Sequence, residues 1–242
     1  GRATLDDFFP GFSEDVQAAG GLELDMIDDV VWYNRGGAVA GTDTDLPALY
    51  ASRPLFEHVV RERIHRDSAI HLRDGCHFLD YQHDAGRKQV TGVRFRDEDG
   101  TETTLDAALT VDATGRTSRT PAWLDRQGYP VPETDRVTVD ITYSTVRIHR
   151  PETVQRGVLI GPEPGRPRGA AMLPVEDDQW EVLLQGLHGE RSPVARKQFI
   201  GWAETLPLPD IAEQLRAREW LSDIRRYPFP ASVRRHYDAL SR

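Results

Sequence analysis

The chain changes its hydrophobic period partway along, and that change limits the folds it can adopt. Between Arg53 and His65, apolar residues recur three or four positions apart, which predicts one helix with a single apolar stripe. The stripe consists of Leu55, Phe56, Val59, Val60 and Ile64. Ser52 is placed to cap the first turn, and Pro54 lies where a missing N–H costs no helical hydrogen bond. From Ala69 onward, short strand-like runs replace the helical spacing, so the chain must combine helix and sheet.

The segment from Ala69 to Val111 predicts strands separated by turns. We expect them near 70–72, near 78–81, at 89–96, at 101–105 and at 107–111, with breaks at 74–75 and 97–100. The last run, Ala107 to Val111, has no polar alternation, which is typical of a strand buried on both faces. It ends at Asp112-Ala113-Thr114-Gly115. The segment therefore predicts an antiparallel meander followed by a return to a buried strand.

The remaining segments predict further helices and strands on both sides of this region. Helical turns are expected within 3–16, helices at 194–205 and 210–220, and strands at 25–33, 137–145, 158–160, 170–174 and 180–185. In the 137–145 strand, valine, isoleucine and tyrosine alternate with threonine, aspartate and serine, which predicts apolar side chains inside and polar ones in solvent. Because Pro121 to Glu133 is proline-rich, we expect it to link two domains, 1–120 and 121–242. The fold class expected is α/β joined to α+β.

Composition excludes several classes of function. The 30 basic and 39 acidic residues give a net charge of -9, which disfavours general nucleic-acid binding. No apolar run approaches the roughly 20 residues that span a bilayer. The only cysteine is Cys76, so neither an internal disulfide nor a cysteine-rich metal site can form. A reducing, cytoplasmic setting is therefore expected.

Common catalytic and metal-binding motifs are missing from the chain. His65, His71, His77 and His83 are six residues apart, whereas ligands on one helix need a spacing of three or four, so no metal site is expected. The sequence contains neither a Walker-type loop nor a GxGxxG motif.

Two places can be interpreted either as binding positions or as ordinary structure. Arg53 lies in the first turn of its helix, where the helix dipole disfavours a cation, so it either meets an anion or reaches into solvent. The small residues Asp112, Ala113, Thr114 and Gly115 follow an apolar strand. Such a turn lets a cofactor approach the backbone closely, or it is only the exit from a strand.

Taken together, these segments resemble a known family. The runs that carry the likeness are 52–57, the meander, 111–119, 174–176, 206–209 and 227–230. They resemble FAD-dependent hydroxylases of the para-hydroxybenzoate hydroxylase fold, and in particular the oxidoreductases and monooxygenases related to polyprenyl-methoxyphenol hydroxylase. The likeness extends over nearly the whole chain.

The resemblance implies a partial FAD/NAD(P)-binding three-layer domain with a β-meander, and a mixed-sheet domain that forms a substrate pocket. It implies that Arg53 lies near FAD and that Asp112, Ala113, Thr114 and Gly115 pass close to it. It also implies a flavin monooxygenase acting on a small organic substrate, with NAD(P)H as the candidate electron donor. The polar side of the 137–145 strand is a candidate lining for the substrate pocket.

The family's GxGxxG motif and its Gly-Asp motif are both missing from these 242 residues. We therefore expect an internal fragment that by itself binds FAD weakly or not at all and is inactive. Two other interpretations remain open: a non-catalytic module that binds a small molecule or a partner, and a flavoprotein of the geranylgeranyl-reductase type.

Overall fold

The computed structural model describes residues 2–43, 45–86, 88–154 and 156–240. The chain forms two compact units, each built from two segments. We call residues 1–63 and 136–232 the sheet unit, and residues 64–135 and 233–242 the meander unit. The sequence predicted a single boundary after residue 120, whereas the chain passes between the units after residues 63, 135 and 232.

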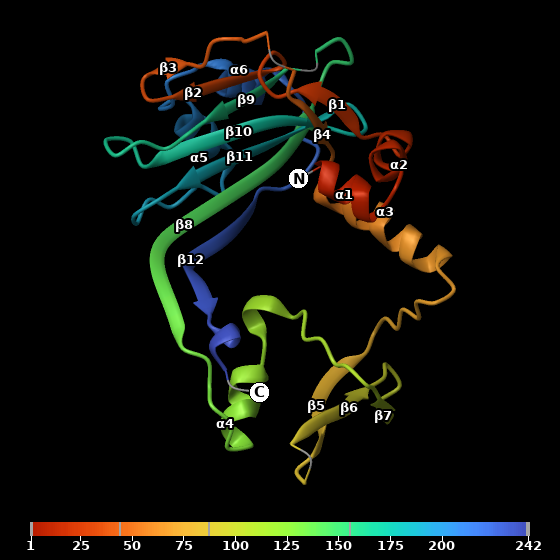
Figure 1. Cartoon of the computed structure of the whole chain (residues 1–242). Helices are drawn as coiled ribbons and strands as arrows, with labels where there is room; N and C mark the ends of the chain where they lie inside the picture. Colours follow the sequence, from red (N-terminus) through yellow and green to blue (C-terminus); the bar gives the residue numbers. More distant parts are fainter. Residues whose placement is uncertain (1, 44, 87, 155, 241–242) are drawn as a thin grey trace. The chain divides into compact units, whose positions relative to one another are not determined.

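The sheet unit contains a mixed sheet of seven strands in the order β12-β8-β11-β10-β9-β2-β3 (Figure 1). In that order the strands are Arg225–Arg235, Thr134–His149, Gln179–Gly186, Arg168–Val175, Gly157–Ile160, Val30–Asn34 and Gly37–Ala38. Strands β8, β11, β10 and β9 pair antiparallel, and β2 joins β9 in parallel. The strands expected at 158–160, 170–174 and 180–185 are confirmed.

Two helices cover one face of this sheet, which we call the inner face. Helices α5 (Arg196–Ala203) and α6 (Asp210–Ala217) pack there over the central strands (Figure 1). The expected inward residues Phe199, Ile211 and Leu215 are fully buried. They join Val182 and Leu184 of β11 in the largest apolar core of the described chain.

Strand β8 buries the opposite side from the one expected. Thr142 and Ser144 are buried, whereas Val137 is 62% exposed. The reason lies farther along the strand: burying Val146 and Ile148 against the inner core also turns Thr142 and Ser144 inward, because side chains alternate with period two. The polar side chains of Thr142 and Ser144 therefore line no solvent-facing pocket, whereas Thr138, earlier in the strand, stays exposed.

Hydrogen bonds to a distant loop make this burial possible. The hydroxyl groups of Ser144 and Ser192 lie 2.7 Å apart, and the Ser192 N–H donates to Thr142 Oγ1 at 2.9 Å. The Thr142 hydroxyl in turn donates to the carbonyl of Glu190. Each buried hydroxyl thus has a partner, which removes most of the cost of taking it out of water.

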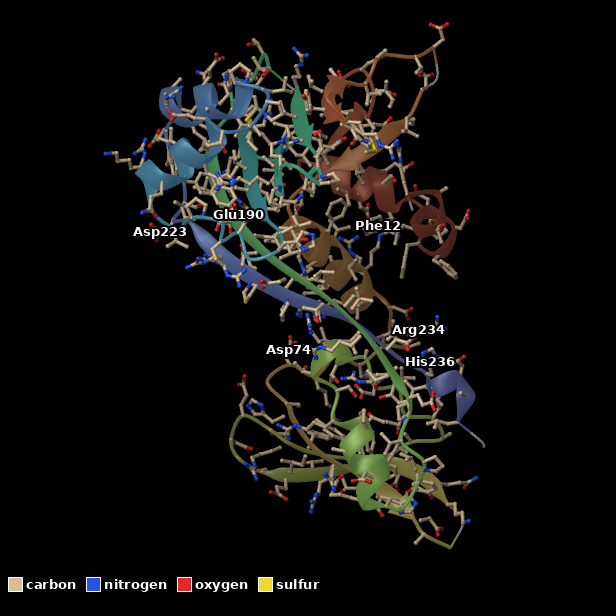
Figure 2. All side chains as sticks on the ribbon, turned by 90° about the vertical axis from the view of Figure 1, so that its left-hand side faces the viewer. Phe12, Asp74, Glu190, Asp223, Arg234 and His236 are labelled. Atoms are coloured by element: carbon tan, nitrogen blue, oxygen red, sulfur yellow. The ribbon has the colours of Figure 1, made fainter. Side chains whose placement is uncertain are left out.

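The N-terminal part of the sheet unit begins with short helices. Helices α1 (Arg2–Phe8) and α2 (Phe12–Ala18) are separated at Gly11, where φ is +78°, which confirms the expected break. Helix α3 (Arg53–Arg66) confirms the helix expected from the apolar stripe. Phe12, Val16 and Val59 form the core between α2 and α3, and Figure 2 shows Phe12 at this junction.

The single strand expected at 25–33 is divided in two. Strand β1 (Leu22–Asp25) pairs with β4 (Pro47–Tyr50), and a turn separates it from β2. Within the turn, Asp25 Oδ1 accepts hydrogen bonds from the N–H groups of Ile27 and Asp28 at 2.7 and 2.9 Å. An aspartate that bonds its own backbone two residues on favours a turn over a continued strand.

The meander unit is a three-stranded antiparallel sheet with one adjoining α-helix. Its elements are β5 (His77–Asp84), β6 (Gln89–Arg96), β7 (Glu102–Asp106), α4 (Thr120–Arg126) and the 3-10 turns at Gly115–Thr117 and Tyr237–Ala239. The strands expected near 78–81, at 89–96 and at 101–105 are confirmed, and so is the turn at 97–100. The aromatic rings of Tyr81, Trp123 and Tyr129 pack together in this unit.

Two expectations for the meander unit are wrong. Residues 70–72 and 107–111 form no strand, and Leu109 and Val111 are 79% and 75% exposed. A strand buried on both faces needs paired neighbours for its backbone. Only the Ala107 N–H bonds a strand, at the Thr91 carbonyl, and no strand of the described residues forms a ladder with 108–111. The proline-rich run after residue 120 is not only a link, because Pro121 occupies the first turn of α4, where proline is tolerated.

None of the helices in the described ranges is long and apolar enough to cross a membrane.

Candidate functional site

The loop that follows residues 107–111 is organised around the Asp112 carboxylate. Asp112 Oδ1 accepts hydrogen bonds from the N–H group of Thr114 at 2.9 Å and from the Thr114 hydroxyl. Asp112 Oδ2 accepts from the hydroxyl of Ser118 at 2.6 Å and from that of Thr120. These bonds, with that from Ser118 the strongest, hold the pKa of Asp112 well below its ordinary value.

A pocket of about 450 Å³ opens beside this carboxylate within the meander unit. Tyr81, Trp123 and Tyr237 supply aromatic walls. The Tyr81 hydroxyl lies 2.7 Å from Thr120 Oγ1, which ties one wall to the Asp112 network. Thr110 Oγ1 also lines the pocket, and it is buried without a hydrogen-bond partner among the described residues. A ligand with polar and flat apolar parts matches such a lining.

The backbone of Gly115 is open to approach at the edge of the same pocket. Its φ is +62°, a conformation that side-chain-bearing residues rarely adopt, and an added Cβ would meet no atom within 4 Å. Ala113 and Thr114 are exposed beside it. The Arg235 guanidinium donates to the carbonyl oxygens of Gly115 and Arg116, at 3.4 and 3.3 Å. The sequence-predicted residues 112–115 therefore form one ordered, accessible loop.

Arg53, the other predicted cofactor residue, belongs to the sheet unit. Its side chain is 88% exposed, and its Nε donates to Glu57 Oε1 at 2.7 Å. This bond raises the pKa of the Arg53 guanidinium. Arg53 is thus exposed, with a carboxylate one turn along the helix as its partner.

Glu176 is a residue near Arg53 that sequence reasoning missed. Its Oε2 accepts a hydrogen bond from the Ser52 N–H at 2.8 Å, and its Oε1 accepts from the Ser52 hydroxyl. The Ser52 hydroxyl oxygen also accepts from the N–H of Leu55, which confirms Ser52 as the helix cap. Because 124 residues separate Ser52 from Glu176, no local pattern could have predicted this contact.

A second hollow, of about 310 Å³, lies on the seven-stranded sheet. Trp32, Leu159, Ala171 and Leu183 of its lining alternate with the residues buried under α5 and α6, and so lie on the opposite face, which we call the outer face. Strands β2, β9, β10 and β11 supply its lining. The sheet unit thus offers a cavity of ligand size on a rigid surface.

The evenly spaced histidines do not gather into one cluster. His83 Nε2 lies 2.9 Å from the Tyr129 hydroxyl, and its ring meets Trp123 edge-on. Over residues 2–43, 45–86, 88–154 and 156–240, no group of three histidine, cysteine, aspartate or glutamate side chains is arranged to hold a metal.

Comparison with solved structures identifies the architecture. The flavin-dependent brominase Bmp2 superposes with a TM-score of 0.67 at 14% identity, over 97% of this chain and 56% of Bmp2. PqsL from Pseudomonas aeruginosa, described as "a probable FAD-dependent monooxygenase", superposes with a TM-score of 0.65 at 17% identity, over 90% of this chain and 58% of PqsL. The chain has the fold of FAD-dependent monooxygenases and halogenases. The mixed α/β fold class expected from the sequence is confirmed.

Sequence comparison adds one curated relative. Protein Rv3254 of Mycobacterium tuberculosis is 28% identical over 254 residues, covering 100% of this chain and 53% of Rv3254. No protein-family model matches the chain. The chain therefore spans about half the length of the relatives it matches.

The Asp112 network makes a testable prediction for acid stability. Because hydrogen bonds lower the pKa of Asp112 in the folded state, its contribution is present above the unfolded value of about 4 and is lost as the pH falls through and below it. The carboxylate is largely exposed, so solvent screening makes the contribution small. We expect Asp112→Asn to lower the free energy of unfolding at pH 7. Below about pH 4, where the wild type loses stability as the pH falls, the variant should lose less. Urea unfolding at a series of pH values measures both effects.

Asp106→Asn provides the control, since Asp106 is an exposed carboxylate at the end of β7. It should leave both the stability at pH 7 and the slope unchanged. Identical pH profiles for wild type and Asp112→Asn would show that the network does not stabilise the loop.

Proposed function

We propose that this chain forms part of an FAD-dependent oxidoreductase of monooxygenase type that acts on a small organic substrate. The observation that carries the proposal is the fold: solved FAD-dependent monooxygenases and halogenases superpose on 90% or more of the chain. The resemblance of the runs at 52–57 and 111–119 supports it independently from the sequence. We place the protein in the cytoplasm and take NAD(P)H as the candidate electron donor.

The residues of the 112–115 loop fit a role in holding FAD. The open backbone of Gly115 allows close approach, and the unpartnered Thr110 hydroxyl offers a hydrogen bond beside it. The carboxylate of Asp112 does not bind the cofactor directly in this proposal. Its bonds to Thr114, Ser118 and Thr120 hold the loop in shape, which saves the ligand the cost of ordering it.

When bound, FAD would supply the redox chemistry and the reaction with dioxygen. The chain's own residues would position the cofactor and hold the substrate. From the resemblance of the 52–57 run we also propose Arg53 as a cofactor residue, and Glu57 keeps its guanidinium at the start of α3. The hollow on the outer face of the sheet would receive the substrate, because its lining is mainly apolar and matches a small organic compound.

Flavin binding tests this proposal. The protein expressed from its own reading frame should bind FAD, seen as a flavin absorption band that stays with the protein through gel filtration. Asp112→Ala should weaken FAD binding by at least about tenfold through loss of the ordered loop, as judged by titration. Asp106→Ala serves as the matched control and should bind FAD like the wild type.

The 242-residue chain alone should bind FAD weakly, because its sequence holds no glycine-rich loop that could clamp the pyrophosphate. Absence of flavin from the protein expressed from its own reading frame would contradict the proposal. Equal FAD affinity in wild type and Asp112→Ala would show that the ordered 112–115 loop has no role in FAD binding.

A further inference from the structure

The shape of the hollow on the outer face of the sheet follows from the register in which its strands pair. One row of directly opposed residues crosses five neighbouring strands, β8, β11, β10, β9 and β2 (Figure 1). In that order the row is Thr145, Leu183, Ala171, Leu159 and Trp32. All five side chains are half-buried and share the outer face, because opposed residues in a sheet point the same way.

Small residues in the middle of this face leave the space open. Ala171 lies between Leu159 and Leu183. Its short side chain leaves a depression in the sheet surface between the two longer leucine side chains. Gly161 lines the hollow next to it, and an added Cβ there would have its nearest neighbour 3.9 Å away. The volume of about 310 Å³ is at the small end of the range for ligand pockets.

Hydrogen-bonding groups without protein partners line the hollow. The side-chain amides of Asn34 on β2 and Gln185 on β11 form no hydrogen bond with any described residue. The Trp32 ring forms part of the wall, and its N–H is buried and unpartnered within the described part of the chain. Elsewhere on the sheet, polar side chains such as Thr142 and Ser144 are paired. The two side-chain amides of the hollow are therefore available to a ligand.

Charged side chains are missing from the lining. Its described residues include no carboxylate, guanidinium, ammonium or imidazole group. Nearby, Arg166 donates to the Gly161 carbonyl at 2.9 Å and is paired with Glu163 at 3.3 Å, so neither charge is left for a ligand. A charged compound would lose its hydration in this hollow and gain no counter-ion.

We infer that the hollow binds a small, uncharged and mainly apolar compound with a hydrogen-bonding group that faces the half-buried amide of Gln185. Ala171 and Gly161 set the size of the compound, and the Gln185 amide sets its orientation. This inference rests on the proposed function, in which the hollow receives the substrate. It goes further by assigning the substrate's charge class and the residues that select it.

A pair of probes that share one ring system tests the inference without flavin. At pH 7, 2-naphthol is uncharged and 2-naphthoate carries a carboxylate. Isothermal titration calorimetry on the full chain should show 2-naphthol binding at least about tenfold tighter than 2-naphthoate, since only the carboxylate needs a counter-ion. Ala171→Leu should weaken 2-naphthol binding by about tenfold or more by filling the hollow.

Two further variants keep the result interpretable. Ala217→Leu makes the same change at an exposed position on α6, over the other face of the sheet, and should leave binding unchanged. Gln185→Leu keeps the volume and removes the amide, and should weaken binding about three- to tenfold even if Ala171→Leu fails to fold.

Equal or tighter binding of 2-naphthoate would overturn the inference, and so would unchanged 2-naphthol binding in both Ala171→Leu and Gln185→Leu. These outcomes are separate from the flavin test. If the probes behave as expected but no FAD binds, the hollow is a site for neutral ligands in a protein without flavin. If FAD binds and the probes fail, only the assigned substrate class is wrong.

Discussion

Replacing Trp180 with alanine should cost about 3–5 kcal/mol of unfolding free energy, a large part of the roughly 5–15 kcal/mol typical of a folded domain. Trp180 is 2% exposed and lies near the start of β11, an interior strand of the seven-stranded sheet. Its indole ring is part of the core beneath α5 and α6, and its N–H donates to the carbonyl of Arg156 at 3.1 Å. The variant loses the buried surface, opens a cavity and leaves that carbonyl without its partner.

Urea unfolding followed by far-ultraviolet circular dichroism would measure this loss. Trp180→Phe keeps a six-membered ring and loses the hydrogen bond and the smaller part of the indole, so it should cost less than Trp180→Ala, about 1–3 kcal/mol. Trp32→Phe is a second control, because the Trp32 N–H is buried without an acceptor among the described residues and makes no bond that phenylalanine would lose. A loss below about 1 kcal/mol for Trp180→Ala would show that the sheet core does not depend on this ring.

Local sequence patterns are sufficient to predict those helices and strands that are stabilised by residues close to them in the chain. Helix α3 begins at Arg53, as its cap and apolar stripe predict, and strand β6 has the predicted limits of 89 and 96. Hairpins and capped helices depend on contacts within a few residues, so spacing alone reveals them.

Patterns failed where distant partners decide the structure. Thr142 and Ser144 look like a solvent-facing side, yet they are buried because Ser192 and Glu190 satisfy their hydroxyl groups. Residues 107–111 look like a buried strand, yet an apolar run forms a strand only where a neighbour pairs with it. In both cases the deciding residues lie outside the window that a periodicity argument uses.

In the candidate site, too, local features could be predicted from the sequence and long-range contacts could not. The small-residue turn at 112–115 was predictable, and Thr114, Ser118 and Thr120 lie close enough in sequence for their bonds to Asp112 to be anticipated as a local hydroxyl–carboxylate network. The contact of Glu176 with Ser52 was not predictable, because it joins the end of β10 to the start of α3 across 124 residues. Its energetic importance makes it the second change with a large expected effect.

Glu176→Ala should destabilise the chain by about 2–4 kcal/mol, because it leaves two donors of Ser52, the N–H and the hydroxyl, without their acceptor in a buried place. Ser52 is only 2% exposed, so water cannot readily replace the carboxylate. Glu176→Gln keeps one acceptor oxygen and should lose less, about 1–2 kcal/mol. Urea unfolding measures the free energies, and hydrogen exchange of the Phe56 N–H, which bonds the Ser52 carbonyl, reports the first turn of α3.

A double-mutant cycle separates this contact from general damage. If the carboxylate acts through Ser52, the Ser52→Ala and Glu176→Ala changes must be non-additive by at least about 1 kcal/mol. Because Arg53 follows Ser52 directly, loosening the helix start should also weaken FAD binding under the proposed function, whereas Ala217→Leu should not. Strict additivity in the cycle would mean that Glu176 stabilises the sheet unit independently of Ser52, and the carboxylate would then have no part in positioning Arg53.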